Sequence, residues 1–451
     1  MYFRKLYNSK IKSLMKKIVF LISRSNDLRF YGPIIDYFNL KKKLYIEFWY
    51  YETDLKNYNF KKYLNPLNLN TSLKKNIKII DLKNTKNLKD YILKNHENIS
   101  YFFSLTFLSK ERISFSSDYM NLIAPKWCVI CHGMDSITQF QKENILYSNK
   151  TNFFFISKFM FSFAKKWLHK FGKKNFKKLT NSKIYYVGNA MYSKKIFKKK
   201  FSKKNKVVYL PFPYLKERYS ENKDFSFQAS FTGTNINLFD FYKRYHNRSF
   251  IYSLFMHIKH IMVNNFEIFK NYKKVKKYYE NENEEKIIKS IKLFCDRNNL
   301  EFISKPRLKF PFNDKLKKYA KIIYDDESKN YPTVLQEELS KSSLVVGSLS
   351  SAVFESVMFN VPYVNISIPN IAFTAKDDKY WYNYSYNSYY NYKGVVFNYN
   401  IKDFIENFKD KKLSNFKIDQ KRRKTYLKHF CGIEKNSNIS IGEQIYKILK
   451  L

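Results

Sequence analysis

The fold of this chain is decided by the stretch LVVGSLSSAVFE at residues 344–355, which continues into VPYVNI at residues 361–366. An apolar run, a turn of small residues, a helical pattern and a second apolar run follow one another, which predicts a parallel β-α-β unit. The turn places backbone N–H groups and the hydroxyls of Ser348, Ser350 and Ser351 at a helix start, where phosphate is favoured. The stretch therefore predicts a nucleotide site at the carboxyl edge of an α/β sheet.

The composition predicts a folded, strongly basic chain with room for two domains. Its 451 residues allow two domains of about 200 residues each, and its 44% hydrophobic and 19% aromatic residues argue against disorder. Only eleven of the 84 basic residues are Arg, so we attribute much of the net charge of +46 to A/T-rich codons. Proteins that read nucleic-acid sequence use Arg forks and known modules, which we do not find, so no specific nucleic-acid partner is expected.

The cysteines and the apolar runs predict the compartment. Four cysteines in a chain of this length do not form a disulfide scaffold, which fits a reducing environment. The apolar run at residues 18–22 is shorter than a signal-peptide core, which has roughly 7–15 apolar residues. No apolar run in the sequence is as long as a membrane span, which needs about 20 residues. We expect a cytoplasmic protein that can also adhere to the inner face of the cell membrane.

Short apolar runs alternate with helical patterns along the chain, which predicts parallel sheets built from βαβ units. The predicted strands are residues 17–22, 44–51, 77–82, 99–105, 127–131, 152–156, 184–187, 225–231, 302–304, 322–324, 344–346, 363–366 and 394–397. The main helical patterns are at residues 31–38, 159–171, 239–293, 333–340 and 352–359, and from 419 to the end.

These elements group into two domains. We expect an N-terminal Rossmann-like domain at residues 1–205, a linker at 206–224 that includes Pro211-Phe212-Pro213, and a second Rossmann-like domain at 225–425. A helical tail at 426–451 is expected to pack on the first domain.

Several motifs together resemble the GT-B superfamily of glycosyltransferases. WCVICHG at residues 127–133 resembles the strand and His-Gly turn of CDP-glycerol glycerophosphotransferase-like enzymes. FFFIS at 153–157 and VGNAM at 187–191 resemble the last N-domain strands of that group and of UDP-GlcNAc 2-epimerases. Residues 347–355 resemble the donor loop of the wider superfamily, although Gly-Ser-Leu-Ser-Ser replaces its acidic-Tyr-Ser-Ser form.

This resemblance covers most of the chain in order, down to CGI at residues 431–433, which looks like the C-terminal end of the glycerophosphotransferase group. It implies an α/β fold with two Rossmann-like domains, an interdomain cleft and a C-terminal helix that crosses back to the first domain. It also implies that the N-terminal domain serves the acceptor and the C-terminal domain binds the nucleotide donor.

The catalytic candidates are His132 and Asp135. His132 follows a predicted strand at a position that would face the cleft, where an imidazole can take the proton of an acceptor hydroxyl. The alternative is a turn histidine bonded to the backbone. Asp135 would orient the imidazole or replace it as the base, or it would simply cap the following helix.

The donor-binding candidates are Ser348, Ser350, Ser351, Glu355, Lys305, Arg307, Thr232, Gly233 and Thr234. Glu355 is expected to bind a ribose, with a helix-dipole role as the alternative, and one serine is expected to be the N-cap. Lys305 and Arg307 flank Pro306, where the related group often has His-Pro, and would stabilise the charge of a departing nucleotide. Residues 232–234 form either a second phosphate turn or an ordinary β-turn.

The run from Lys165 to Lys206 holds sixteen Lys and no acidic residue. Such a run is usually a solvated face. If its helix places Phe159, Phe163 and Trp167 beside the lysines, it is instead an element that binds an anionic membrane surface.

Together these features predict a nucleotide-sugar-dependent glycosyltransferase, or a related glycerol-phosphate transferase, that builds bacterial surface polysaccharide, capsule or lipopolysaccharide on a glycan or lipid-linked acceptor. No Asp-x-Asp motif follows a suitable strand, with Asp325-Asp326 a weak exception, so we expect no cofactor and no essential metal. Two alternatives stay open. One is a nucleotide-sugar 2-epimerase of the same fold, which would need further cleft carboxylates, and the other is a non-catalytic protein that binds polyanions or membrane surfaces.

Overall fold

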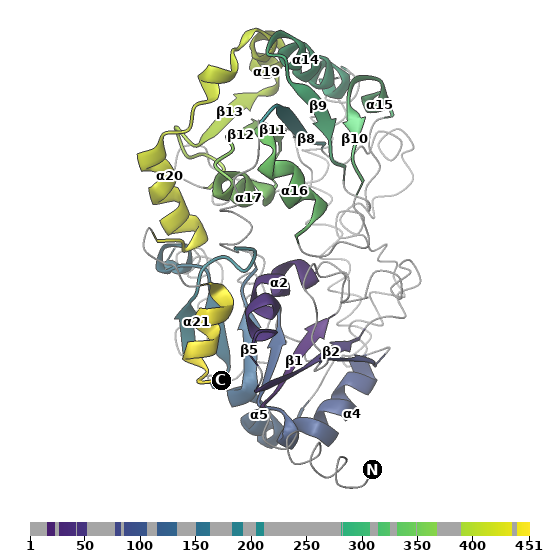
Figure 1. The fold of residues 1–451 in the computed structure, drawn as a ribbon, viewed down its shortest axis with the longest axis vertical. Coiled ribbons are helices and arrows are strands. Elements are labelled where there is room, and N and C mark those ends of the chain that lie inside the picture. Colours follow the sequence, from purple (N-terminus) through teal and green to yellow (C-terminus); the bar gives the residue numbers. More distant parts are fainter. Residues whose placement is uncertain are drawn as a thin grey trace, which may run out of the picture. The chain divides into compact units, whose positions relative to one another are not determined.

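A computed structural model provides the structure of the chain (Figure 1). It describes residues 16–22, 27–41, 43–51, 77–82, 85–105, 115–132, 150–162, 183–192, 204–211, 281, 283–306, 314–324, 332–348, 350–367, 389–434 and 440–451. The chain divides into unit 1, made of Met1–Lys199, Asp326–Val334 and Lys424–Leu451, and unit 2, made of Lys200–Asp325 and Leu335–Arg423. None of the helices in the described ranges is long and apolar enough to cross a membrane.

Unit 1 contains a sheet of seven described strands, all parallel, in the order β3-β2-β1-β4-β5-β6-β7. Its strands are β1 (Lys16–Ile22), β2 (Leu44–Tyr50), β3 (Ile77–Asp81), β4 (Tyr101–Ser104), β5 (Trp127–Ile130), β6 (Asn152–Phe155) and β7 (Lys183–Tyr186). The chain builds one half of the sheet outward from β1, returns, and builds the other half from β4. This is the strand order of a Rossmann-like domain.

Helices cover both faces of this sheet. They are α2 (Asp27–Phe38), α4 (Thr85–Asn95), α5 (Ser117–Ile123) and α21 (Ile441–Ile448). Phe20 of β1 packs against Tyr31 and Phe38 of α2, with ring centroids 5.0 and 6.3 Å apart. Phe20 pairs with Phe48 of β2, and successive residues of a strand point to opposite faces of the sheet. The next residue, Trp49, therefore points to the other face, where its ring packs against that of Tyr91 of α4 at 4.8 Å.

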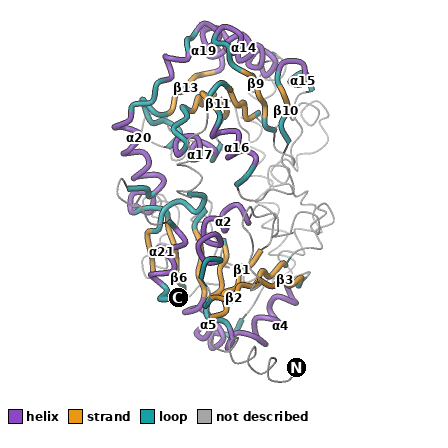
Figure 2. Tube along the Cα trace, in the orientation of Figure 1, coloured by secondary structure: helices purple, strands orange, loops and turns teal. Residues whose placement is uncertain are grey.

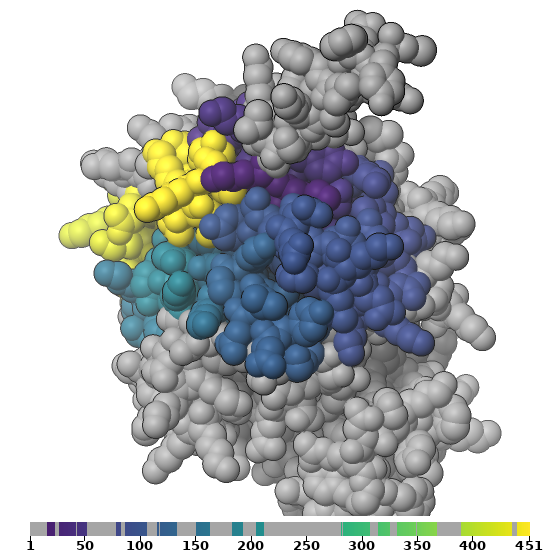
Figure 3. Space-filling view, turned by 90° about the horizontal axis from the view of Figure 1, so that it is seen from below, coloured from purple at the N-terminus to yellow at the C-terminus, as the bar shows by residue number. Residues whose placement is uncertain are grey.

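The C-terminal helix α21 packs on α2, although the two helices lie at opposite ends of the sequence. Figure 3 shows the last residues, in yellow, against the first described segments, in purple. The rings of Tyr37 and Tyr446 are 5.8 Å apart, and a Cβ on Gly442 would lie 2.7 Å from the Cβ of Tyr37. Glycine therefore permits the close approach of the helices, and the predicted return of the C-terminal helix is confirmed.

Unit 2 contains six described strands, also all parallel, in the order β10-β9-β8-β11-β12-β13 (Figure 2). They are β8 (Lys206–Leu210), β9 (Glu301–Ser304), β10 (Lys321–Ile322), β11 (Ser342–Gly347), β12 (Tyr363–Ser367) and β13 (Val396–Asn400). The order repeats that of unit 1, with β8 and β11 at its centre. The prediction of two Rossmann-like sheets is confirmed.

The helices of unit 2 lie on both sides of its sheet. They are α14 (Asn283–Arg297), α15 (Leu316–Tyr319), α16 (Val334–Ser340), α17 (Ala352–Met358) and α19 (Ile401–Asn407). Helix α20 (Gln420–Tyr426) begins in unit 2, and its last residues and the π-helical turn that follows at Leu427–Cys431 belong to unit 1. Ile287 and Phe294 of α14 and Phe404 of α19 pack in one core with Val346 of β11. Figure 1 shows α16 and α17 on the opposite side of the sheet.

The predicted linker at residues 206–224 is wrong at its start. Residues 206–210 form β8, which pairs with β9 on one side and β11 on the other. Val207, Val208 and Tyr209 are at most 1% exposed. The run of lysines before this strand and Pro211 after it resemble a linker, and five residues are too few to reveal a central strand by periodicity. The strand predicted at 225–231 and most of the helical region at 239–293 lie outside the described residues.

Candidate functional site

The two central strands of unit 2 form a switch point. From β8 the chain builds outward through β9 and β10, and it then returns to add β11 on the other side of β8. Ligands of open α/β sheets bind outside the carboxyl ends of the strands at such a reversal. Gly347, the last residue of β11, pairs with Leu210, the last residue of β8. The serine turn predicted from the sequence therefore begins at the switch point.

The turn combines a required glycine with a buried hydroxyl that has no partner within the described ranges. A Cβ on Gly347 would lie 2.6 Å from the hydroxyl oxygen of Tyr363. The side chain of Tyr363 can therefore lie this close to the backbone only because residue 347 is a glycine. The hydroxyl oxygen of Ser348 is buried and has no hydrogen-bond partner among the described residues. Buried hydroxyls without a partner are uncommon in folded proteins, and a ligand or water usually accounts for them.

Ser350, Ser351 and Glu355 belong to the start of α17. Ser351 is the N-cap residue but its side chain makes no capping hydrogen bond, whereas the hydroxyl of Ser350 accepts from the N–H of Ala352 at 3.3 Å. Ser350 is 8% exposed, Ser351 is exposed, and Glu355 is fully buried in the packing of the helix. The expected N-cap serine is therefore Ser351 by position, and Glu355 lies in the first turn of the helix.

Lys305 lies at the same edge of the sheet as the turn. Ser304 pairs with Tyr209, and the N–H of Lys305 donates to the carbonyl of Tyr209 at 2.9 Å, so Lys305 is level with Leu210 and Gly347. Two strand spacings, about 10 Å, separate the backbones of Lys305 and Gly347. Residues at one level of a parallel sheet point to the same face, so the largely buried Lys305 side chain lies on the face of Gly347.

The next two strands, β12 and β13, each place an asparagine side chain in register with Gly347. Asn365 of β12 pairs with Gly347 on one side and with Asn398 of β13 on the other. The Nδ2 of Asn365 donates to Asn398 at 2.9 Å, and the Nδ2 of Asn398 donates to Asn391 at 2.9 Å. The face of the sheet beside the turn is therefore polar and is held by hydrogen bonds between side chains.

In unit 1, His132 lies at the carboxyl edge of the sheet, just after β5. Its Nδ1 is 3.2 Å from the carbonyl oxygen of Leu105, and its ring packs against Phe30 of α2 at 4.8 Å. A carbonyl oxygen only accepts hydrogen bonds, so Nδ1 carries the proton and the lone pair lies on Nε2. This backbone-bonded histidine matches the structural alternative, and its tautomer is also the one that a general base needs.

The switch point of unit 1, between β1 and β4, is closed by Tyr31. Its hydroxyl lies 3.1 Å from the carbonyl oxygen of Leu21 and 3.2 Å from that of Phe103, and the residue is fully buried. Burial first, and then the charges of Asp27 and Tyr51, raise the pKa of Tyr31 well above its usual value, so the phenol remains a neutral donor. A side chain thus occupies the place where a Rossmann-like sheet would hold a nucleotide.

The remaining candidate residues lie outside the described part of the chain. They are Asp135, Arg307, Thr232, Gly233 and Thr234, together with the Asp325-Asp326 pair. Their roles stay predictions. Within the described ranges, no group of three or more His, Cys, Asp or Glu side chains is arranged to hold a metal ion.

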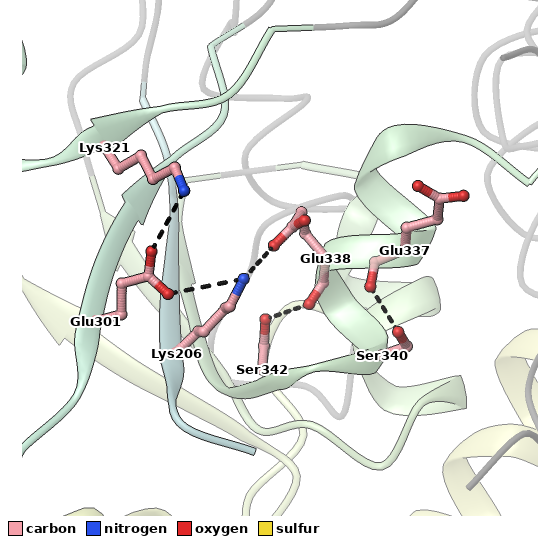
Figure 4. A network of polar contacts seen from close by, with 7 residues as sticks. All are labelled: Lys206, Glu301, Lys321, Glu337, Glu338, Ser340 and Ser342. Carbon is pink, nitrogen blue, oxygen red and sulfur yellow. Dashed lines mark hydrogen bonds and ion pairs between the residues drawn. The ribbon is translucent and has the colours of Figure 1, made fainter. Parts of the chain in front are cut away.

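The end of the Lys165–Lys206 run has a structural role. Lys206 lies 3.1 Å from the carboxylate of Glu338 and 3.7 Å from that of Glu301, which is also 3.9 Å from Lys321 (Figure 4). Lys206 and Glu301 begin β8 and β9, so this network joins the amino ends of the strands, at the edge away from the serine turn. Most of the run lies outside the described residues, and its membrane-binding role stays a prediction.

Two features of the structure were not predicted from the sequence. Tyr31 is one of 39 tyrosines and carries no local signal of its position between two strands. The second feature is the pair Arg422 and Arg423 of α20. This pair could have been noticed in the sequence, because two adjacent arginines are unusual in a chain where only eleven of 84 basic residues are Arg.

No protein-family model matches the chain, and no curated protein matches it. Solved structures are similar over nearly the whole chain. UDP-GlcNAc 2-epimerase from Methanocaldococcus jannaschii is 12% identical, with 97% of this chain and 99% of that chain covered and a TM-score of 0.48. UDP-GlcNAc 2-epimerase from Neisseria meningitidis, bound to UDP-GlcNAc, is 10% identical, with 96% and 99% covered and a TM-score of 0.48. The wall teichoic acid polymerase TagF is 11% identical, with 99% and 93% covered and a TM-score of 0.45.

The strand order of the two sheets, rather than these likenesses, establishes the fold. Two Rossmann-like sheets in one chain are the architecture of GT-B enzymes. The chain has the GT-B fold. A fold that transferases and epimerases share does not select a reaction by itself, so the function has to be argued from the site.

Proposed function

We propose that the chain is a nucleotide-sugar-dependent transferase that moves a sugar, or glycerol phosphate, to a glycan or lipid-linked acceptor of a bacterial surface polysaccharide. The donor binds at the carboxyl edge of the unit 2 sheet. Its phosphates contact the donor turn, which we define as Gly347, Ser348, Ser350 and Ser351.

The observation that carries this proposal is the buried hydroxyl of Ser348, which has no partner among the described residues and follows the glycine at the switch point. A phosphate oxygen is a strong acceptor for a hydroxyl, and the backbone at Gly347 offers no side chain to exclude it. The closed switch point of unit 1, filled by Tyr31, supports the choice of unit 2 as the donor unit.

The remaining roles follow from charge and position. In this proposal Lys305 and Arg307 stabilise the charge that grows on the departing nucleotide, and Glu355 accepts hydrogen bonds from the ribose. His132 takes the proton of the acceptor hydroxyl through Nε2, and Asp135 assists it. The proposed reaction uses no metal, and the protein works in the cytoplasm or on the inner face of the membrane.

The test is a thermal-shift panel with UDP-, CDP-, CMP- and GDP-linked donors, followed by transfer assays with the nucleotide that protects. We expect one nucleotide class to raise the melting midpoint of the wild type. Lys321→Met is a control for the loss of a cation elsewhere in unit 2, because its ammonium lies 3.9 Å from the carboxylate of Glu301 at the start of β9, and it should respond like the wild type.

Three other outcomes would decide against parts of the proposal. No protection by any nucleotide would reject the donor site and leave a non-catalytic binding protein. Conversion of the donor without any acceptor would identify an epimerase. Equal protection of wild type and a Ser348→Ala variant would place the donor away from the turn.

A further inference from the structure

Helix α17 follows the donor turn, and its far end is closed by the backbone. The N–H of Asn360 donates to the carbonyl of Val357 at 3.1 Å, and the N–H of Val361 donates to that of Ser356 at 2.9 Å. Asn360 is left-handed, with φ of 57°. This pair of bonds is a Schellman motif, which ends the helix and leaves its last carbonyl oxygens able to accept further hydrogen bonds.

Arg423 of α20 binds these carbonyls with two nitrogens. Its Nε donates to the carbonyl oxygen of Val357 at 2.8 Å, and its Nη2 donates to that of Met358, also at 2.8 Å. A planar guanidinium fixes both bonds at once, which a flexible ammonium group cannot do. The side chain therefore sets both the position and the direction of the helix end.

Two further side chains hold the same helix end. Lys204, two residues before β8, donates to the carbonyls of Phe359 and Asn360 at 3.2 and 3.4 Å. Gln420, one turn before Arg423 on α20, donates to the side-chain oxygen of Asn360 at 3.1 Å. Cations are favoured here because carbonyl dipoles make a helix C-terminus negative.

The two cations remain together although like charges repel. Partial burial, and then the charge of Arg423, lower the pKa of Lys204. Both groups nevertheless point at the carbonyls of one seven-residue helix. The helix end therefore compensates a repulsion that would otherwise separate them.

The neighbouring Arg422 acts on a second element that packs on α17. Its guanidinium lies 5.5 Å from the ring centre of Tyr392. Tyr389, from the same segment, packs against Phe354 in the first turns of α17 at 4.9 Å. Adjacent arginines of α20 thus contact the end of α17 and the segment that packs along its side.

We propose that Arg423 is a positioning residue for the donor turn and acts through α17. The helix is short and rigid, about 10 Å long, so a change of direction at its last turn moves its first turn. If loss of Arg423 leaves the turn in its binding position only a tenth of the time, the dissociation constant of a nucleotide rises about tenfold. This inference rests on the proposed function, because it takes the turn to be the donor site.

The experiment compares full-length wild type with Arg423→Met, Arg423→Lys and the control Lys424→Met, which removes an exposed charge from the next position of the same helix. Amide hydrogen exchange is measured over residues 352–358, with α14 as an internal reference in the same unit. Binding of UDP, CDP, CMP and GDP is measured by calorimetry.

We expect Arg423→Met to speed exchange in residues 352–358 but not in α14, and to weaken binding of the preferred nucleotide about tenfold. Arg423→Lys should show exchange and affinity between those of the wild type and Arg423→Met, because lysine keeps the positive charge but lacks the planar guanidinium that makes both hydrogen bonds. Lys424→Met should match the wild type.

Unchanged exchange over residues 352–358 in Arg423→Met would overturn the inference, whether or not a nucleotide binds. Faster exchange with unchanged nucleotide affinity would overturn it as well, because α17 would then be held for stability alone. A wild type that binds none of these four nucleotides would contradict the proposed function itself, and the exchange data would still decide whether Arg423 orders α17.

Discussion

Gly432 lies against Gly188, and a Cβ on Gly432 would be 2.8 Å from the Cα of Gly188 and 2.1 Å from the carbonyl oxygen of Ile156. The tail of the chain therefore crosses directly over the residues that follow β6 and β7. The N–H of Asn189 donates to the carbonyl of Cys431 at 2.8 Å, and the hydroxyl of Ser157 donates to the carbonyl of His429. The tail is thus part of the carboxyl edge of unit 1.

Gly432→Ala should destabilise the protein strongly. Gly432 has φ of 64°, and the added methyl group meets backbone atoms that cannot rotate away, so we expect a loss of at least about 3 kcal/mol. Gly394→Ala is the matched control. It has φ of 80°, but its Cβ would meet the flexible side chain of Arg422 at 3.2 Å, so the cost should be about 1–2 kcal/mol. Urea unfolding of both variants checks this, and equal costs would contradict the close packing of the tail.

Ser348→Ala should separate binding from stability. The hydroxyl has no protein partner among the described residues, so its removal should leave the free energy of unfolding unchanged or slightly higher. A lost hydrogen bond to the charged phosphate should weaken nucleotide binding about ten- to hundredfold. In contrast, Ser350→Ala removes the bond to the N–H of Ala352 and should cost about 1 kcal/mol of stability. Calorimetry and urea unfolding measure both effects, and a destabilised Ser348→Ala variant would contradict the ligand role.

Tyr31→Phe should change the stability of the protein at alkaline pH. The folded chain holds the pKa of Tyr31 well above its usual value, so above pH of about 10 the unfolded chain loses this proton while the folded chain keeps it. The contribution of this phenol is therefore complete below that pH and falls by about 1.4 kcal/mol per pH unit above it. The variant should lose about 1 kcal/mol at neutral pH and show a shallower alkaline decline. Identical slopes in both proteins, measured by urea unfolding from pH 8 to about 11, would show that Tyr31 ionises freely.

His132→Gln should lower turnover with the identified donor and acceptor by about 10²- to 10⁴-fold, because the amide cannot take a proton. Donor affinity should stay within about twofold, since the acceptor side is affected and not the donor turn. His96→Gln is the control, because its Nδ1 also faces a backbone carbonyl, that of Leu93, at 2.9 Å. Equal turnover in the two variants would remove His132 from the mechanism.

Glu355→Gln should lower donor affinity while turnover at saturating donor changes little. The substitution keeps the shape of a fully buried side chain and removes its charge, and a hydrogen bond between a ribose hydroxyl and a carboxylate is worth about tenfold in affinity. Donor titration of initial rates measures the change. An unaltered Michaelis constant would mean that Glu355 serves the packing of α17 alone.

Much of the fold could be predicted because its signals are local. The apolar runs that became β1, β2, β5, β6, β11 and β12 are each visible within a few residues, and their alternation with helices leads to parallel sheets. His132 and Gly347 could be singled out for the same reason, since a polar or small residue directly after a strand is also a local pattern. Whether they act in catalysis or binding stays a prediction.

The sequence by itself determined two Rossmann-like halves and the turn at the end of β11, because periodicity and turn chemistry depend on neighbouring residues. Only the tertiary structure decided that β8 is a central strand, that Tyr31 bridges Leu21 and Phe103, and that Arg423 holds the end of α17. These contacts join residues far apart in the chain. Their partners are set by the packing of whole elements, so no local pattern can specify them.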